Sequence, residues 1–238
     1  MNLAPSIEDL QVRHLQAATA EELGVGERQP IVGVLQGRDR LNALSRATRL
    51  LWHGVRDLAR AKPTRPIRVL DIATGAGGIP IRLWKLAARS GLKIAVDGCD
   101  SNPTSLELAR RRARENGIPV QFFAADPLKG ELPGGYDVIT SSLYLHHLPD
   151  GRALQLLHTL DAAAEQRVIL HDHVRSPGGV ALARLASSLI HGATTRQEAE
   201  SAIRSAFTPA EALDLARRAG IEGAVARAHW PCCFVLSW

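Results

Sequence analysis

The stretch that decides the fold is Arg68-Val69-Leu70-Asp71-Ile72-Ala73-Thr74-Gly75-Ala76-Gly77-Gly78. It begins as an apolar, β-branched run that is typical of a buried strand and ends in a glycine-rich turn. Glycine lets the backbone turn sharply and pass close to a ligand. Because an amphipathic segment starts at Ile79, we expect a strand, a ligand-binding turn and a helix.

From this stretch onward, short β-branched runs alternate with longer amphipathic segments, which indicates βαβ units on a parallel sheet. The alternation starts after Lys62-Pro63-Thr64-Arg65-Pro66. Strands are expected near 67–72, 93–99, 120–124, 136–140, 167–171, 222–228 and 232–238. Helices are expected near 79–90, 103–116, 151–164, 179–190, 195–206 and 209–219. Asn102 before Pro103, and Thr208 with Glu211, mark two helix starts.

The N-terminal part of the chain has a different, purely helical pattern. Residues 6–23 predict one helix, and an apolar stripe predicts a second through Leu41, Leu44, Leu51, Val55 and Leu58. We therefore expect a helical cap or substrate region over 1–62, a catalytic domain over 63–238, and a helical insertion at about 176–207.

Composition limits the classes of protein to consider. The 238 residues are 45% hydrophobic and 22% charged, which excludes a disordered or collagen-like chain. Aromatic residues make up only 4%, which argues against a base-stacking surface for nucleic acid despite the net charge of +5. The three cysteines form no disulfide framework, and no apolar run is long enough to span a bilayer. We expect a soluble, cytoplasmic protein.

Two acidic residues follow the next strands. Asp100 ends the second strand, where a carboxylate can accept hydrogen bonds from both ribose hydroxyls of a nucleoside. NAD and S-adenosylmethionine (SAM) share that ribose contact. Asp126 follows the third strand, where an adenine amino group can donate to it.

Taken in order, Val69 to Gly77, Gly98-Cys99-Asp100, Ala125-Asp126 and Tyr136-Asp137-Val138-Ile139 resemble the motifs of class I SAM-dependent methyltransferases, over roughly residues 67–172. The resemblance implies a Rossmann-like α/β fold with a seven-stranded, mostly parallel sheet flanked by helices and an N-terminal helical extension. It also implies SAM as the cofactor and S-adenosylhomocysteine as the product. Ala73 departs from the family, which usually has glycine there; its methyl group is tolerated unless the backbone needs positive φ.

The resemblance also assigns the cofactor contacts. The glycine loop faces the methionine and ribose parts of SAM, Asp100 binds the ribose, and Asp126 meets the adenine. The full set of expected cofactor-binding residues is Asp71, Ala73, Thr74, Gly75, Gly77, Asp100, Ser101, Asn102, Asp126, Pro127, Ser141 and Ser142. The alternative for these residues is structural, as turn formers and helix caps. Arg40 either meets the SAM carboxylate or lies on a solvated helix face.

Open α/β sheets bind ligands at the carboxyl ends of their strands, so the reactive groups are expected after the fourth and fifth strands. Methyl transfer gains most from orientation, and a base assists when the acceptor must lose a proton. His146 and His147 are the candidate bases, and this His-His-Leu sequence resembles the branch that includes ubiquinone and menaquinone biosynthesis methyltransferases. His171 and His173, with Asp172 or His146, form an alternative metal set, but we expect no metal.

The insertion suggests what the acceptor is. Its Leu182, Leu185, Leu189 and Ile190 predict an apolar lid or wall, which favours a small hydrophobic or aromatic acceptor such as a polyketide, phenol or quinone precursor, methylated on oxygen or carbon. One alternative is an RNA or protein methyltransferase, motivated by a pI of about 9.6 and Arg-rich helices. Another is a non-catalytic nucleotide-binding protein. A homodimer is left open.

Overall fold

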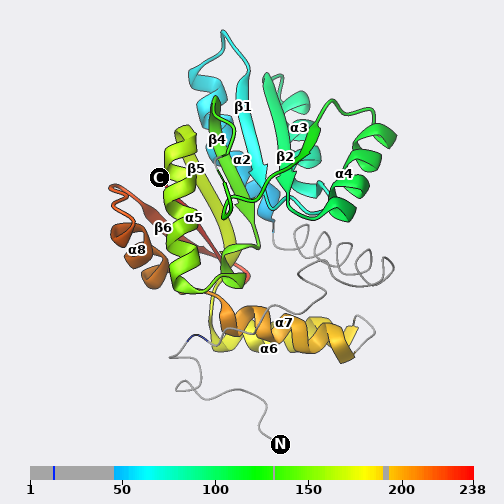
Figure 1. Ribbon diagram of the computed structural model, residues 1–238. Helices are drawn as coiled ribbons and strands as arrows, with labels where there is room; N and C mark the ends of the chain where they lie inside the picture. The colour runs from blue at the N-terminus through cyan, green and yellow to red at the C-terminus, as the bar shows by residue number, and fades with distance from the viewer. Residues whose placement is uncertain (1–12, 14–45, 131, 190–192) are drawn as a thin grey trace, which may run out of the picture.

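A seven-stranded sheet forms the centre of the protein (Figure 1). The computed structural model describes residue 13 and residues 46–130, 132–189 and 193–238. The strands are β1 (Ile67–Ile72), β2 (Ile94–Asp100), β3 (Gln121–Ala124), β4 (Tyr136–Ser142), β5 (Ala164–His173), β6 (Val225–His229) and β7 (Cys233–Ser237). Their order is β3-β2-β1-β4-β5-β7-β6, and β7 runs antiparallel to the other six strands. The expected fold class is confirmed.

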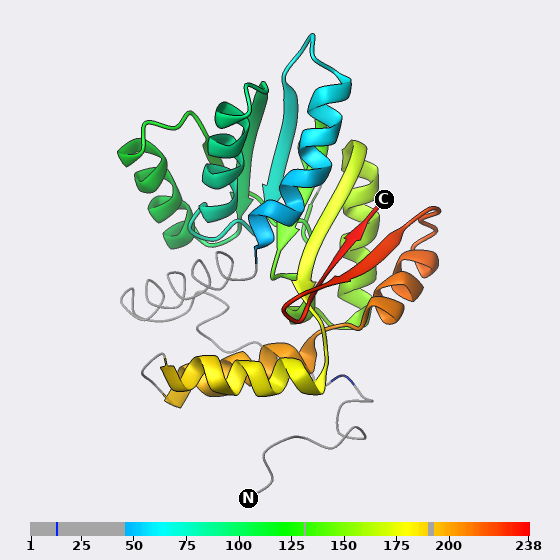
Figure 2. The same ribbon diagram turned by 180° about the vertical axis from the view of Figure 1, so that it is seen from behind.

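Helices cover both faces of the sheet (Figures 1 and 2). The described helices are α2 (Ala47–Ala61), α3 (Gly78–Arg89), α4 (Pro103–Glu115), η2 (Leu145–His147), α5 (Asp150–Ala163), α6 (Pro177–Leu189), α7 (Ala193–Ser205) and α8 (Pro209–Arg218). α2, α3 and α4 pack on one face, and α5 and α8 pack on the other. α6 and α7 form a hairpin beyond the carboxyl ends of β4 and β5, and α7 contacts η2 there.

The alternation of side chains along β1 builds both layers. Ile67 and Val69 point into the core beneath α2, α3 and α4, whereas Leu70 and Ile72 point into the core beneath α5 and α8. Successive side chains of a strand leave opposite faces, so a strand in the middle of a doubly covered sheet has apolar side chains on both faces, and in β1 only Arg68 and Asp71 depart from this. In α2, Leu51 and Val55 of the expected stripe are fully buried. Leu41 and Leu44 lie outside the described residues.

The capping residues in the sequence correctly predicted where two helices begin. The Asn102 side chain accepts hydrogen bonds from the backbone of Thr104 and Ser105 (2.9 and 3.2 Å), and Thr208 and Glu211 form the expected capping box. β6 begins at Val225, three residues later than expected, because Gly223 adopts a φ of 73° in a turn. β5 is longer than expected at both ends, since β4 and β7 pair with it along its length.

The N-terminal region is described only in part. The expected helix over 6–23 and the region 1–62 stay predictions, because residues 1–12 and 14–45 lie outside the described residues. α2 itself packs on β1, β4 and β5. In the part of the chain that the structure describes, no helix has the length and apolar character needed to cross a membrane.

Candidate active site

The loop between β1 and α3 contains three residues with positive φ angles. Ala73, Gly75 and Gly77 adopt positive φ angles of 49°, 55° and 74°. A Cβ atom on Gly77 would lie 2.6 Å from Phe122 Cζ and 2.9 Å from Ala109 Cβ. Both the conformation and the space therefore require glycine at position 77, where the chain turns into α3.

Ala73 has a positive φ, the one condition under which its methyl group is not expected to be tolerated. Its φ of 49° lies in the left-handed region, where a Cβ atom crowds the following carbonyl and costs about 1–2 kcal/mol. Alanine at this position is therefore strained where glycine would not be. The amide of Thr74 donates to Cys99 O (3.0 Å), and this bond ties the loop to β2.

Asp100 lies directly against the glycine loop. Its Oδ2 accepts a hydrogen bond from Gly75 N (2.8 Å) and its Oδ1 accepts one from Asn102 N (2.9 Å). A carboxylate has about four acceptor positions, so two stay available for the hydroxyls of a sugar. The loop and the end of β2 therefore converge as the sequence predicted.

Asp126 lies at the neighbouring strand end. Its Oδ1 accepts from Leu128 N (3.0 Å), and Lys129 Nζ approaches Oδ2 at 3.4 Å. Burial, and then the charges of Asp71 and Asp100, raise the pKa of the Cys99 thiol to about 12, and Asp126 adds to the effect. Asp100 ends β2 and Asp126 follows β3, and these two strands pair in parallel, so both carboxylates lie at the carboxyl edge of the sheet.

Asp71 sits beneath this edge and is 1% exposed. Its Oδ1 accepts a hydrogen bond from Thr140 Oγ1 (2.7 Å), which links β1 to β4. Burial raises the pKa of Asp71 to about 7, although the bond from Thr140 and the charge of Arg82 oppose the rise.

The other expected cofactor contacts also follow strands at the carboxyl edge. Ser101 is exposed, Thr74 and Pro127 are buried, and Asn102 uses its side-chain oxygen to cap α4. Ser141 Oγ donates to Ile72 O (3.3 Å). Asn102 therefore has a structural role as the N-cap of α4. A contact between these residues and a cofactor stays a prediction.

The ends of β4 and β5 bring a histidine and a carboxylate together. His146 Nδ1 lies 2.6 Å from Asp172 Oδ1, and His146 N donates to Asp172 Oδ2 (3.1 Å). Both residues are buried, with 3% and 2% exposure. Burial acts to raise the pKa of Asp172, but the charge and hydrogen bond of His146 outweigh it and the pKa is lowered. An ionised carboxylate only accepts, so Nδ1 carries the proton and Nε2 of a neutral ring is the basic nitrogen.

Two further histidine rings lie near this pair, and a third histidine, His171, precedes Asp172 on β5. The His147 and His173 rings have their centroids 4.0 and 5.3 Å from that of His146. β5 extends through His173, and His171 Nδ1 lies 3.0 Å from Ser142 Oγ. Burial lowers the pKa of His171 to about 4. Among the residues that the structure describes, no group of three or more His, Cys, Asp or Glu side chains is arranged to hold a metal ion.

Sequence reasoning missed three groups at this edge. It named Asp172 in an alternative metal set, although the adjacency of β4 and β5 could have paired it with His146. It passed over Tyr144, whose pKa is raised to about 12 by burial and then by Asp126 and Asp100. It also passed over Arg13, which no local pattern marks. Arg40 and Ile190 lie outside the described residues, as do the side chains of Leu185 and Leu189, and Leu182 is 41% exposed.

Known proteins share this domain. Residues 69–166 match the family model described as a methyltransferase domain. The chain is 34% identical over 116 residues to a demethylmenaquinone methyltransferase of Thermus thermophilus, covering 48% of this chain and 50% of that protein. It is 39% identical over 85 residues to a ubiquinone biosynthesis O-methyltransferase of Bordetella parapertussis. This match covers 35% of this chain and 33% of that protein. The chain thus spans about half of the first relative's length and a third of the second's.

Solved structures share the fold. Human N-acetylserotonin methyltransferase in complex with SAM matches with a TM-score of 0.66 at 14% identity, over 97% of this chain and 64% of that one. A plantazolicin methyltransferase in complex with S-adenosylhomocysteine matches with a TM-score of 0.62 at 14% identity, over 88% of this chain and 89% of that one. The protein therefore has the Rossmann-like class I methyltransferase fold. Residues 69–166 are similar to a methyltransferase domain, and the resemblance to class I SAM-dependent methyltransferases is confirmed.

Proposed function

We propose that this protein transfers a methyl group from SAM to a small hydrophobic or aromatic molecule, on oxygen or carbon. The observation that carries the proposal is the contact between Gly75 and Asp100, since it joins the glycine loop to the carboxylate that we propose for ribose binding in a class I methyltransferase fold. The named relatives, which act in quinone biosynthesis, support the same reaction class.

The residues at the sheet edge fit SAM. Its adenosyl group offers hydrogen-bond donors in the ribose hydroxyls and the adenine amino group, and its sulfonium and ammonium groups are cations. Asp100 has acceptor positions left for the ribose, and Asp126 lies one strand further out for the adenine. Gly75 and Gly77 let the backbone approach the ligand without side chains. When bound, SAM supplies a methyl group on a positively charged sulfur.

His146 is the proposed base. Its Nδ1 is held by Asp172, so Nε2 is oriented to take a proton from a phenol, enol or activated carbon acid as the acceptor attacks. The Asp172 carboxylate stabilises the imidazolium that forms, as in other His–Asp pairs. His147, whose ring lies 4.0 Å from that of His146, is the second candidate.

The α6–α7 hairpin is the proposed wall of the acceptor site. It lies beyond the strand ends and contacts the turn that carries His146.

The cysteines Cys99, Cys232 and Cys233 are free, which supports a reducing compartment such as the cytoplasm.

The test is a screen with SAM labelled in the methyl group. Phenols, catechols, reduced quinones and RNA are offered separately, and products are detected by mass. We expect label in a phenol or quinol, and SAM binding without NADH binding in a parallel titration. Label only in RNA would favour an RNA methyltransferase, and tight NADH binding without SAM binding would overturn the proposal.

A further inference from the structure

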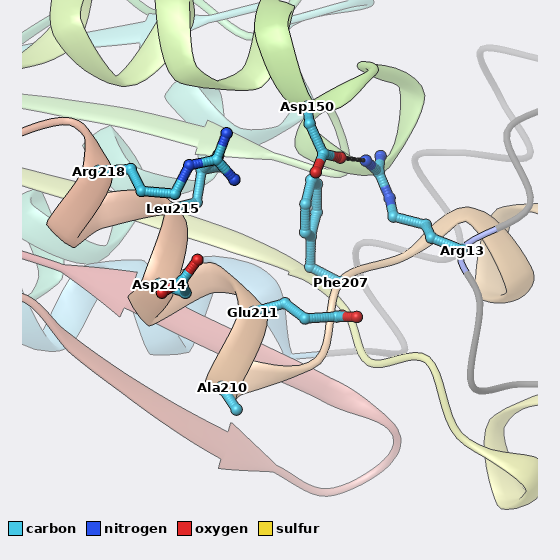
Figure 3. Close-up of a pocket in the computed structure, with 8 residues that line it drawn as sticks. All are labelled: Arg13, Asp150, Phe207, Ala210, Glu211, Asp214, Leu215 and Arg218. Carbon is cyan, nitrogen blue, oxygen red and sulfur yellow. Dashed lines mark hydrogen bonds and ion pairs between the residues drawn. The ribbon is translucent and has the colours of Figure 1, made fainter.

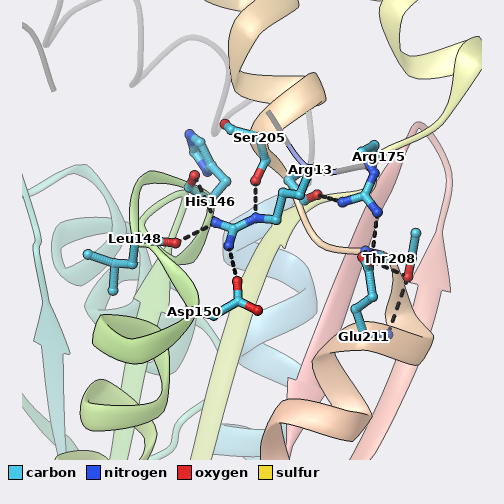
Figure 4. Close-up of polar contacts among 9 residues, drawn as sticks. Arg13, His146, Leu148, Asp150, Arg175, Ser205, Thr208 and Glu211 are labelled. Carbon is cyan, nitrogen blue, oxygen red and sulfur yellow. Dashed lines mark hydrogen bonds and ion pairs between the residues drawn. The ribbon is translucent and has the colours of Figure 1, made fainter. Parts of the chain in front are cut away.

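Arg13 holds the turn that carries His146 (Figure 4). Its Nη1 donates to Asp150 Oδ1 (2.8 Å), and its Nη2 donates to the carbonyls of Leu148 and His146, the latter at 3.4 Å. Its Nε donates to Ser205 O (2.6 Å). The side chain is 9% exposed although the residue is more than 130 positions away from each partner. One guanidinium therefore joins the end of α7 to the turn between β4 and α5.

Most of the groups that bind this guanidinium are backbone carbonyl oxygens, which need hydrogen-bond donors. α7 ends at Ser205, and the last carbonyls of a helix have no partner within it. Arg13 satisfies Ser205 O, while Arg175 donates to Ala206 O (2.7 Å). The Arg13 guanidinium carbon also lies 3.6 Å from the centroid of the Phe207 ring. Cations are favourable at a helix C-terminus and over an aromatic face, so the site selects a planar cation.

This contact sits beside a cavity of about 360 Å³ that Arg13 and Asp150 line together with α8 (Figure 3). Arg218 lines the same cavity from α8 and is exposed. The two arginines therefore differ in burial and in contact with the turn, although they share residue type and neighbourhood.

We propose that Arg13 is a positioning residue for methyl transfer, which fixes the turn of His146 relative to the α6–α7 hairpin. The proposal rests on the function proposed above. The bonds to His146 O, Leu148 O and Asp150 hold the turn at His146 and in the four residues after it, and the bond to Ser205 O fixes it to the hairpin. A misplacement of about 1 Å between reacting groups can lower a rate on the order of 100-fold, so this anchor acts on catalysis without touching the substrate.

Chemical rescue tests the inference. Arg13→Ala leaves a pocket shaped for a guanidinium, so kcat should fall roughly 10- to 100-fold with the KM for SAM changed by less than about threefold. Millimolar guanidinium chloride should restore most of the lost kcat, whereas sodium chloride or methylammonium chloride at the same concentration should not. Arg13→Lys should stay impaired, because an ammonium group cannot reach all these acceptors in one plane. Arg218→Ala should behave as the unaltered protein, with or without guanidinium.

A measurement without turnover separates this inference from the proposed function. Amide hydrogen exchange of residues 145–149 should quicken in Arg13→Ala, and guanidinium should slow it again, whether or not an acceptor is known. Asp150→Asn, at a side chain 58% exposed, should show a smaller effect of the same kind in a fully folded protein. Unchanged exchange and unchanged kcat in Arg13→Ala would overturn the inference, as would a loss that guanidinium does not restore in a variant with native thermal stability.

Discussion

Replacing Asp71 by asparagine should change how the stability of this protein depends on pH. Asp71 is 1% exposed, and burial raises its pKa from an ordinary 3.8 to about 7. Asparagine has nearly the same shape, and its carbonyl oxygen can accept the bond that Thr140 Oγ1 now donates at 2.7 Å. The variant therefore removes the titration with little change in packing.

The direction and size follow from linkage. The folded protein holds a proton on Asp71 at pH values where the unfolded chain has lost it, so stability falls as the pH rises from about 4 to about 7. Each pKa unit is worth about 1.4 kcal/mol, which makes the full loss from Asp71 about 4 kcal/mol. Asp71→Asn should match the unaltered protein near pH 4 and exceed it increasingly up to pH 7, beyond which the gap stays constant.

Urea unfolding at several pH values measures this difference. Subtraction of the two proteins cancels other titrations, including that of His171, whose lowered pKa removes stability as the pH falls. The control is Asp57→Asn, at a side chain 58% exposed, which should give a constant small difference. Parallel stability curves for the unaltered protein and Asp71→Asn between pH 4 and 8 would refute the reasoning.

Three further predictions concern the loop and the proposed base. Ala73→Gly should stabilise the protein by about 0.5–1 kcal/mol, because it relieves a positive φ, whereas Ala88→Gly in the exposed part of α3 should destabilise it. An unchanged or lowered thermal stability of Ala73→Gly would show that Ala73 is not strained. Gly77→Ala should cost about 2–4 kcal/mol, because a Cβ there would lie 2.6 Å from Phe122 Cζ. Gly91→Ala is its control, with a similar φ of 65° and open space, and equal losses would rule out the clash. Asp172→Asn should lower kcat about 10²- to 10⁴-fold with SAM affinity nearly unchanged, since the tautomer of His146 is no longer fixed; retained turnover would remove the pair from the reaction.

The amino-acid sequence alone determined the strands of the sheet and marked the position of the candidate cofactor site. Strand and helix patterns are local, so the alternation after Pro66 predicted all seven strands, and caps at Asn102 and Thr208 placed two helix starts. The glycine spacing from Gly75 to Gly77 and the acidic strand ends marked the candidate cofactor site, because parallel strands deliver their carboxyl ends to one edge.

Tertiary structure decided what those residues touch. Asp172 pairs with His146 because β4 and β5 lie side by side, and Arg13 reaches the same turn from more than 130 positions away. Neither contact leaves a periodic signal in the chain, since a side chain's partner in space depends on the packing of whole elements. The positive φ of Ala73 is likewise imposed by the loop's attachment to β2, against the preference of the residue itself.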